Sequence, residues 1–330
     1  MPANLTPQYK EAEQRYREAE GHAEKLAALH EMLALLPKHK GTEKLQADLR
    51  RRIAKLEEEG DHARRAGGHR FDPGHVVREG AGQWVLAGPP NAGKSALLRA
   101  LTHAHPEVAP YPFTTRVPLP GMMPFEDVQI QLVDTPALTG QHGEPYMPNL
   151  VRSADGVVLV LDVGADDVEE AVSAFAALLE RAHVWPAGRA RPAEASPLLA
   201  MRPVLVAANK CDLDGDGILA ALAAEAAGTD LPMFAVSAER GAGLEGLRRA
   251  LFDGLGRIRI YAKEPGKKAD LQRPFVLSRG ATVHDLARSV HKEVAERLKF
   301  ARIWGSAKFE GQQVDRDHVL LDRDVVELHA

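Results

Sequence analysis

The chain has 330 residues, enough for two or three domains with at least one sizeable core, and its 45% apolar and 27% charged residues are ordinary for a soluble globular protein. Its formal net charge of −4 argues against wholesale neutralisation of a nucleic acid, and its single cysteine, Cys211, excludes an internal disulfide framework. No stretch approaches the roughly 18 to 20 continuous apolar residues of a membrane span, and the polar N-terminus lacks the apolar core of a signal peptide, so we expect a cytoplasmic protein.

Residues 1–60 are predicted to form a helical hairpin. Ala, Leu, Glu, Lys and Arg dominate this segment, and leucines recur at helical spacing on both sides of the "PKHKG" break at residues 37–41. We expect these leucines to pack the two helices against each other. Residues 61–82 are rich in glycine and charge, which predicts a linker.

Residues 83–256 alternate between strand-like and helix-like patterns. The strand-like runs are nearly continuous in apolar residues, which is typical of parallel strands covered on both faces; they lie at 83–88, 128–134, 156–163, 203–210 and 233–238. Helical patterns separate them, at 95–102, 167–182, 217–227 and 243–255. The alternation predicts a doubly wound α/β domain with a mostly parallel sheet, and an exposed loop at 186–199.

Residues 257–330 have a different pattern, which predicts a small α+β domain of the β-grasp type. Strand-like runs at 257–263 and 273–278 precede a helix-like run at 283–298, and two further strand-like runs follow at 301–305 and 324–330. The segment carries more lysine and arginine than aspartate and glutamate, although the whole chain is acidic.

The stretch "GPPNAGKS", Gly88–Ser95, fits the phosphate-loop pattern and lies between an apolar strand and a helix-forming run. Its glycines let backbone N–H groups turn toward an anion, and the helix N-terminus adds a partial positive charge. Lys94 supplies a point charge for the outer phosphates, and the Ser95 hydroxyl is a ligand for Mg²⁺. The predicted nucleotide contacts here are Gly88, Pro89, Pro90, Asn91, Ala92, Gly93, Lys94, Ser95 and Ala96.

Two later motifs favour guanine over adenine. In "NKCD" the Asp212 carboxylate can accept both the N1–H and the exocyclic amine of guanine, and adenine offers no such pair of donors. Asn209 is expected to brace the base and the phosphate loop, and the Lys210 stem to lie over the ring. The strand end "VSA" brings Ser237 and the Ala238 backbone N–H, which could meet the guanine carbonyl.

The stretch "LVDTPAL" places Asp134 at a strand end between these motifs. In phosphate-loop enzymes an aspartate here holds Mg²⁺, usually through water. Asp134 and Thr135 are therefore added to the predicted nucleotide site.

Together, "GPPNAGKS", "YPFTTR", "DTPAL", "NKCD" and "SA" resemble the translation-factor-class GTPases, and "YPFTT" is typical of the Obg and developmentally regulated GTP-binding (DRG) branch. Residues 37–59 resemble the N-terminal helical hairpin of DRG proteins, and the C-terminal segment resembles their TGS domain, a ubiquitin-like β-grasp module. The resemblance implies GTP hydrolysis with Mg²⁺, GTP or GDP as ligand, and the ribosome or its RNA as partner. It leaves open a stabilising protein partner.

The family pattern also assigns Thr115, rather than Thr114, as the threonine that reaches Mg²⁺ and the γ-phosphate. The chain departs from that pattern in two ways. Too few residues separate Asp134 from Asn209 for the domain that DRG proteins insert there, and Ala137 replaces the usual glycine of the third motif, which restricts the backbone but keeps the N–H.

Leu138 stands where many small GTPases carry a water-orienting glutamine. The chain resembles GTPases with an apolar residue there, in several of which an asparagine at the position of Asn91 coordinates K⁺, an ion that neutralises developing charge. Asn91 could instead be a turn residue that tolerates an unusual backbone angle. Lys94, Thr115 and Asn91 are thus the predicted catalytic residues, with Ser95, Thr115 and Asp134 for Mg²⁺ and Asn91 for K⁺.

Two functions follow from these residues. The first is a GTP-hydrolysing switch that acts on ribosomes or RNA, with modest basic clusters in the C-terminal segment at Lys267, Lys268, Arg273, Arg288 and Lys292. The second is a GTP-binding scaffold with negligible turnover, favoured by Ala137 and Leu138, that binds a protein partner through its terminal domains. The histidines show no close ligand spacing, so we expect no zinc site.

Overall fold

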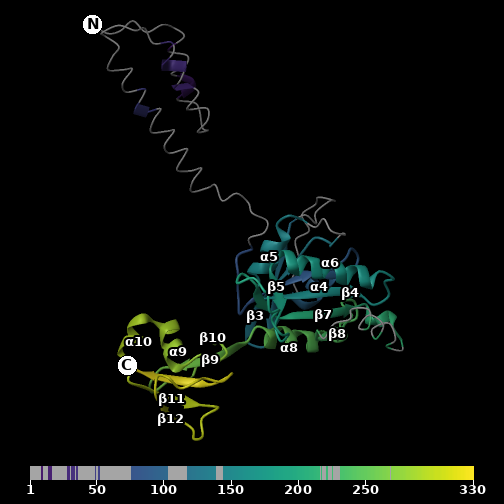
Figure 1. Cartoon of the computed structure of the whole chain (residues 1–330). Coiled ribbons are helices and arrows are strands. Elements are labelled where there is room, and N and C mark those ends of the chain that lie inside the picture. The colour runs from purple at the N-terminus through teal and green to yellow at the C-terminus, as the bar shows by residue number, and fades with distance from the viewer. Residues whose placement is uncertain are drawn as a thin grey trace, which may run out of the picture. The chain divides into compact units, whose positions relative to one another are not determined.

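The computed structural model describes residues 9, 14–16, 28–29, 31–33, 35, 49, 51–52, 76–102, 117–138, 144–215, 217, 221, 225, 231–267 and 269–330. Its contacts divide the chain into two units, Met1–Asp72 and Pro73–Ala330, which are described separately here (Figure 1). The finer boundaries at residues 60, 82 and 256 stay predictions.

In the first unit, every described residue is helical. Tyr9, Leu29, Met32 and Leu49 are buried in one apolar cluster, against which Leu33 packs. This agrees with the predicted helices and their leucine packing.

The second unit contains a six-stranded sheet, which we call the six-stranded domain. The strand order is β2-β3-β1-β4-β7-β8, and every pairing is parallel except that of β2 with β3. The strands are β1 Gln83–Ala87, β2 Leu119–Phe125, β3 Val128–Asp134, β4 Gly156–Asp162, β7 Val204–Asn209 and β8 Met233–Ala235. The mostly parallel α/β sheet predicted from the sequence is confirmed.

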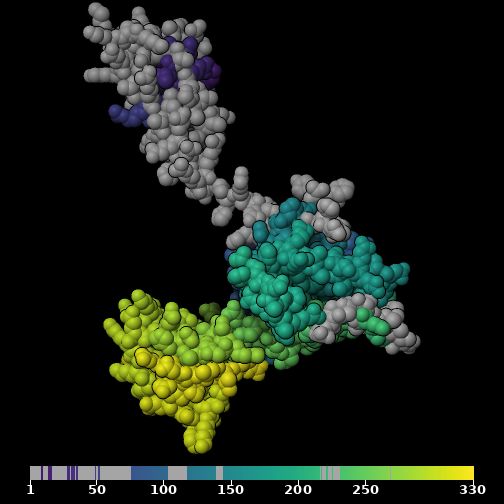
Figure 2. Space-filling model, viewed as in Figure 1, coloured from purple at the N-terminus to yellow at the C-terminus, as the bar shows by residue number. Residues whose placement is uncertain are grey.

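Helices cover both faces of this sheet, which is why its central strands are mostly apolar. The helices are α4 Lys94–Thr102, α5 Met147–Ser153, α6 Val168–Arg181 and α8 Leu244–Gly254. Val85 packs with α5 and α6 in one core cluster, whereas its neighbour Trp84 packs with α4 and α8 in another, because successive side chains of a strand point to opposite faces. Figure 1 shows α5 and α6 on the side of the strands opposite to α8, and Figure 2 shows the side chains of this domain, in teal and green, packed into a continuous surface.

The edge strand β2 was not predicted from the sequence. Pro120 and Pro124 lie within it and weaken its strand signal, but a proline is tolerated at a sheet edge, where its missing N–H interrupts no ladder. The short parallel pair β5 Val184–Pro186 and β6 Ala200–Arg202 was also missed, although the loop between these strands is largely exposed, as predicted.

The C-terminal part of the second unit forms a five-stranded sheet in the order β10-β9-β13-β11-β12. The strands are β9 Arg257–Lys263, β10 Phe275–Ser278, β11 Phe300–Trp304, β12 Gln312–Val314 and β13 Val325–His329. Side chains of α9 Val283–Val290, among them Leu286, pack on one face of the sheet against Ile260 and Ile303. This is the small β-grasp domain predicted from residues 257–330.

The helix-like run at 283–298 is two helices, α9 and α10 Lys292–Arg297. A capping box between Thr282 and Asp285 begins α9, and His291 separates the two helices with an extended backbone (φ −167°, ψ 143°). Among the described residues of the whole chain, no helix combines the length and apolarity needed to cross a bilayer.

Candidate functional site

The predicted phosphate loop lies between β1 and α4 and borders a cavity of 540 Å³. The cavity is lined by Pro90, Asn91, Gly93, Lys94, Ser95, Ala96, Arg99, Thr135, Ala137 and Lys210. The Lys94 ammonium is buried and donates to the carbonyl oxygens of Gly88 and Pro89 at 2.9 and 2.8 Å. Burial lowers the pKa of Lys94, and the nearby Asp134 carboxylate opposes this shift. A cation thus faces a cavity at a helix N-terminus, which is the arrangement that binds phosphate.

Two glycines of the loop cannot be replaced without displacing neighbours. A Cβ atom at Gly88 would lie 2.2 Å from the carbonyl oxygen of Val160 on β4. Gly93 has a φ of +88°, and a Cβ there would lie 2.2 Å from the side-chain nitrogen of Asn209. The loop therefore packs directly on β4 and on Asn209, the first residue of "NKCD".

Asn209 joins the two motifs. Its side chain is buried, its Nδ2 donates to the Ala92 carbonyl at 2.9 Å, and its Oδ1 accepts from the Ala238 backbone N–H at 3.1 Å. The predicted bracing of the phosphate loop is present. The Ala238 N–H, which we expected to meet guanine, here donates to Asn209.

Asp212 lies in the short turn after β7, with its side chain 9% exposed. A hydrogen bond from the buried Ser237 lowers the pKa of this carboxyl, so it is ionised at neutral pH. Arg240 approaches it at 3.7 Å. Lys210 has a left-handed backbone (φ 63°), and its ammonium pairs with Asp162 at 2.6 Å.

Asp134 and Ser95 lie side by side and carry oxygen atoms of the kind that bind Mg²⁺. The Ser95 hydroxyl donates to Asp134 Oδ2 at 2.5 Å, and the other carboxylate oxygen, Oδ1, is buried without a hydrogen-bond partner. Hard oxygen ligands with an unused acceptor suit Mg²⁺. Burial raises the pKa of Asp134, although the Ser95 hydrogen bond and Lys94 work against it.

The remaining predicted residues have different environments. The Thr135 hydroxyl is buried and donates to the Leu86 carbonyl at 2.7 Å, which anchors the segment after β3. Leu138 is buried in the core, and its backbone N–H donates to the Gly88 carbonyl at 2.9 Å. Asn91 is exposed with φ 60°, which fits the turn interpretation and leaves K⁺ binding untested. Thr115 lies outside the described residues.

Arg99 and Asp162 were not predicted from the sequence to belong to this site. Arg99 lies one helical turn after Ser95, donates to the Ser95 carbonyl at 3.1 Å and lines the cavity. Its spacing of four from Ser95 was the available signal. Asp162 was assigned no role from the sequence, but it pairs with Lys210. No group of three or more His, Cys, Asp or Glu side chains that could hold a metal occurs among the described residues.

Replacing Asp134 by asparagine should raise the stability of the nucleotide-free protein at neutral pH. Burial raises the pKa of Asp134, so its ionised form opposes folding, and the amide removes that charge. The gain in the free energy of unfolding is fully present above the pKa that Asp134 has in the folded protein. It disappears as the pH falls from that pKa to the lower pKa of the unfolded chain. We expect a rise in the unfolding midpoint of about 2–4 °C, the shift produced by about 1 kcal/mol, measured by calorimetry at several pH values.

The exposed Asp166→Asn substitution is the matched control, and its effect should stay within about 0.5 kcal/mol. A lower midpoint for Asp134→Asn at neutral pH would contradict this account of the buried carboxylate. The same variant should lose the dependence of nucleotide binding on Mg²⁺.

Two family models match the chain. Residues 83–187 match the model described as a 50S ribosome-binding GTPase, and residues 258–330 match the TGS domain. A GTP-binding protein of Halobacterium salinarum is 30% identical over 373 aligned positions, which cover 94% of this chain and 99% of that protein. The chain belongs to the family of GTP-binding proteins that includes the developmentally regulated G-proteins.

Two other relatives in this family of GTP-binding proteins also align over more than nine-tenths of this chain and of their own length. A GTP-binding protein of Methanocaldococcus jannaschii is 28% identical, with 93% of this chain and 92% of that protein covered. Developmentally-regulated G-protein 2 of Arabidopsis thaliana is 26% identical, with 93% and 91% covered. The Halobacterium alignment is longer than the 330 residues of the chain, so that relative has residues without a counterpart here. Below, the six-stranded domain is called the GTPase domain and the five-stranded domain the TGS domain.

Proposed function

We propose that this protein binds GTP with Mg²⁺, hydrolyses it to GDP and phosphate, and acts as a ribosome-associated or RNA-associated switch. The observation that carries the proposal is the pair of hydrogen bonds made by Asn209. They hold the phosphate loop beside the segments that follow β7 and β8 and that carry Asp212 and Ala238, which supports one guanine nucleotide bound across these segments. Membership of a GTP-binding protein family supports the same reading.

In this proposal, Lys94 and the N-terminus of α4 hold the outer phosphates. Ser95 and Asp134 hold Mg²⁺ together with Thr115, and the ion neutralises charge on the phosphates. Asp212 selects guanine, and the Lys210 stem lies over the ring. Because the Leu138 side chain is buried in the core, the residue at this position orients no water. A K⁺ ion at Asn91 supplies the missing positive charge in the transition state.

The ribosome is the proposed partner because of the matched model, whose description is a 50S ribosome-binding GTPase. The TGS domain exposes the basic side chains Lys267, Arg273, Arg288 and Lys292, and Lys268 lies outside the described residues. Such residues can contact a phosphate backbone. Co-sedimentation with ribosomes in a GTP analogue and in GDP tests this partner, with binding expected to depend on the nucleotide. Equal, negligible binding in both would contradict it.

A second candidate is a GTP-binding scaffold with negligible turnover. The burial of Leu138 favours it, since the usual means of orienting the attacking water is missing.

A turnover assay in K⁺ and then Na⁺ buffer separates the two candidates. We expect K⁺ to raise the rate at which GTP is hydrolysed by about tenfold or more, within the range expected of a preorganised charge. Asn91→Ala should remove most of this increase while leaving GDP binding in place, since its side chain is exposed. Hydrolysis at background level in both salts, with and without ribosomes, would favour the scaffold, and a K⁺ effect that survives Asn91→Ala would exclude Asn91 as the ligand.

A further inference from the structure

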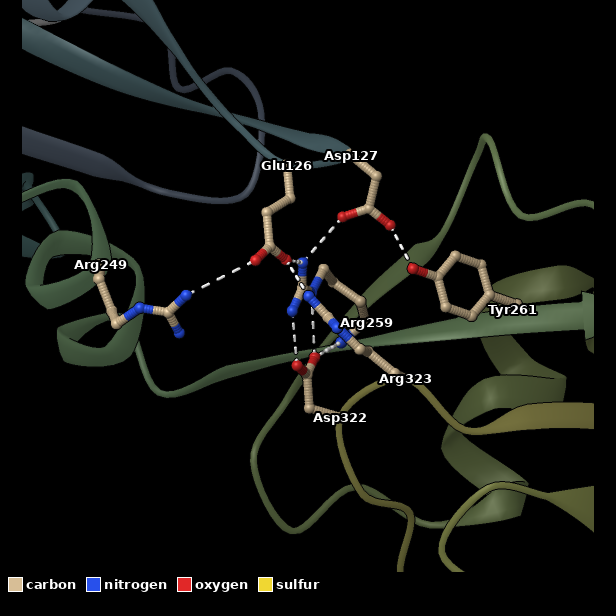
Figure 3. A network of polar contacts seen from close by, with 7 residues as sticks. All are labelled: Glu126, Asp127, Arg249, Arg259, Tyr261, Asp322 and Arg323. Carbon is tan, nitrogen blue, oxygen red and sulfur yellow. Dashed lines mark hydrogen bonds and ion pairs between the residues drawn. The ribbon is translucent and has the colours of Figure 1, made fainter. Parts of the chain in front are cut away.

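Three acidic and three basic side chains meet where the GTPase domain contacts the TGS domain (Figure 3). At their centre is Arg259 on β9, which is only 3% exposed. We call this cluster the Arg259 joint; its members are Glu126, Asp127, Arg249, Arg259, Tyr261, Asp322 and Arg323.

The guanidinium of Arg259 binds carboxylates from both domains. It donates to Glu126 and, at 2.9 Å, to Asp127, which together form the turn between β2 and β3. It also donates to Asp322 of the TGS domain at 2.6 and 3.1 Å. Burial alone would lower the pKa of Arg259, but these hydrogen bonds outweigh it and raise the pKa. One planar, bidentate cation therefore joins the two domains.

Other contacts reinforce the Arg259 joint. The Tyr261 hydroxyl donates to Asp127, and Arg323 donates to Glu126. The guanidinium lies 4.7 Å from the ring centre of Phe252 on α8, which is stacked on Phe125 at the end of β2. Arg259 is the buried member of this cluster, whereas the side chains of Arg249 and Arg323 are more than half exposed. Leaving a buried charge without its partners is costly, so the pairing of Arg259 decides whether the contact is stable.

Residues with a strained backbone occur both at the nucleotide cavity and in the Arg259 joint. Among the described residues, the non-glycine residues with positive φ are Asn91, Glu126, His183, Lys210 and Arg323. Two of these, Asn91 and Lys210, line the nucleotide cavity, and two, Glu126 and Arg323, form an ion pair in the Arg259 joint. Strained backbone gathers at functional sites because the surrounding structure must hold it in place.

The turn held by Arg259 belongs to a hairpin whose other end reaches the nucleotide site. Strands β2 and β3 pair from Phe125 with Val128 at the turn to Leu119 with Asp134 at the base. Asp134 is the proposed Mg²⁺ ligand, and Thr115 precedes β2 by only a few residues. The hairpin is about 20 Å long by the rise of a strand, and its antiparallel ladder makes it a stiff connection between the two ends.

The covalent link between the domains is short as well, since α8 ends at Gly254 and β9 begins at Arg257. A displacement of the hairpin turn therefore cannot be absorbed by a long linker, and the Arg259 joint must either move with the turn or open.

Resting on the GTP binding proposed above, we propose that the Arg259 joint couples the nucleotide site to the TGS domain through the β2–β3 hairpin. GTP and GDP stabilise different positions of Asp134 at the base of the hairpin, and the hairpin transmits this difference to the contact between the domains. By thermodynamic linkage, the state of the contact in turn changes the preference between GTP and GDP by the same factor.

Hydrogen exchange of the full-length protein, followed by mass spectrometry, tests the coupling. The reporters are β9 and residues 319–324, compared in Mg²⁺ with GDP and with a non-hydrolysable GTP analogue. We expect the exchange rate of these peptides to differ about fivefold or more between the nucleotides, the lower end of ordinary allosteric coupling. Dissociation constants for both nucleotides are measured on the same samples.

The uncoupled variant combines Arg259→Met with Glu126→Gln and Asp127→Asn, so that no carboxylate of the turn is left unpaired. In this variant, the exchange rates of the TGS reporters should be the same with both nucleotides. The ratio of its dissociation constants for GTP analogue and GDP should differ from the native ratio by the factor that separates the two exchange rates in the native protein. Tyr261→Phe is a milder variant that keeps the packing, and it should reduce the difference partly. Arg302→Met, at an exposed position on β11 of the same sheet, should leave the difference unchanged.

Equal exchange of the reporters in both nucleotides, with both nucleotides bound, would overturn the coupling and leave the proposed function intact. The coupling would also be overturned if Tyr261→Phe and the uncoupled variant kept the full difference in reporter exchange rate between the two nucleotides. If neither nucleotide binds, the proposed function fails and the coupling fails with it.

Discussion

Asp212→Asn is expected to weaken GTP and GDP binding by about 10²–10⁴-fold. The Asp212 side chain is only 9% exposed, and a hydrogen bond from Ser237 lowers the pKa of its carboxyl; in our proposal the carboxylate accepts two charge-assisted hydrogen bonds from guanine. Each such bond contributes about 1.5–3 kcal/mol, which gives the stated range when both are lost. The asparagine amide has one acceptor and one donor group, so its NH₂ would face one of the two N–H donors of guanine and lose that hydrogen bond.

Xanthine nucleotides provide the internal check on Asp212. Xanthine carries a carbonyl where guanine carries its exocyclic amine, so the asparagine variant should bind the xanthine nucleotide more tightly than GDP. Both affinities can be measured by calorimetric titration in Mg²⁺. Asp253→Asn, the same chemical change at an exposed position of α8, should leave both affinities unchanged. Undiminished GDP binding by Asp212→Asn would exclude this residue as the guanine acceptor.

Gly93→Ala should weaken nucleotide binding and destabilise the GTPase domain, although it adds a single methyl group. The φ of +88° costs an alanine about 1–3 kcal/mol. The new Cβ would also lie 2.2 Å from Asn209 Nδ2, which must then move away from the Ala92 carbonyl. We expect GDP affinity to fall about tenfold or more, because one hydrogen bond between the two motifs is lost, together with a lower unfolding midpoint.

A double-mutant cycle distinguishes the steric effect of Gly93→Ala from backbone strain. In an Asn209→Ala background the clash is absent, so Gly93→Ala should cost less binding energy than it does in the native chain. Gly246→Ala on α8 is the matched control, since no heavy atom lies within 4 Å of its added Cβ, and it should gain up to about 1 kcal/mol of stability. Strictly additive effects in the cycle would show that Gly93 and Asn209 act independently.

Much of the GTPase domain could be predicted from local patterns. The strand-like runs became β1, β3, β4, β7 and β8 with bounds that differ by at most a few residues, because a strand buried on both faces is apolar at every position. The phosphate loop and "NKCD" could be recognised because their chemistry depends on residues close together in the sequence. Strand β2 could not, since its tolerance for Pro120 and Pro124 depends on its place at the sheet edge.

The amino-acid sequence by itself determined the phosphate-loop motif, the "NKCD" motif for which we propose guanine selectivity, and the order of the GTPase and TGS domains. The tertiary structure alone decided how these parts meet. Asn209 contacts Ala92 across 117 residues, and Arg259 contacts Glu126 across 133. No local pattern predicts such contacts, because they depend on which strands are neighbours in the sheet and on how closely the glycines let them approach. The Arg259 joint is therefore invisible in the sequence, where its members are ordinary charged residues spread over two domains.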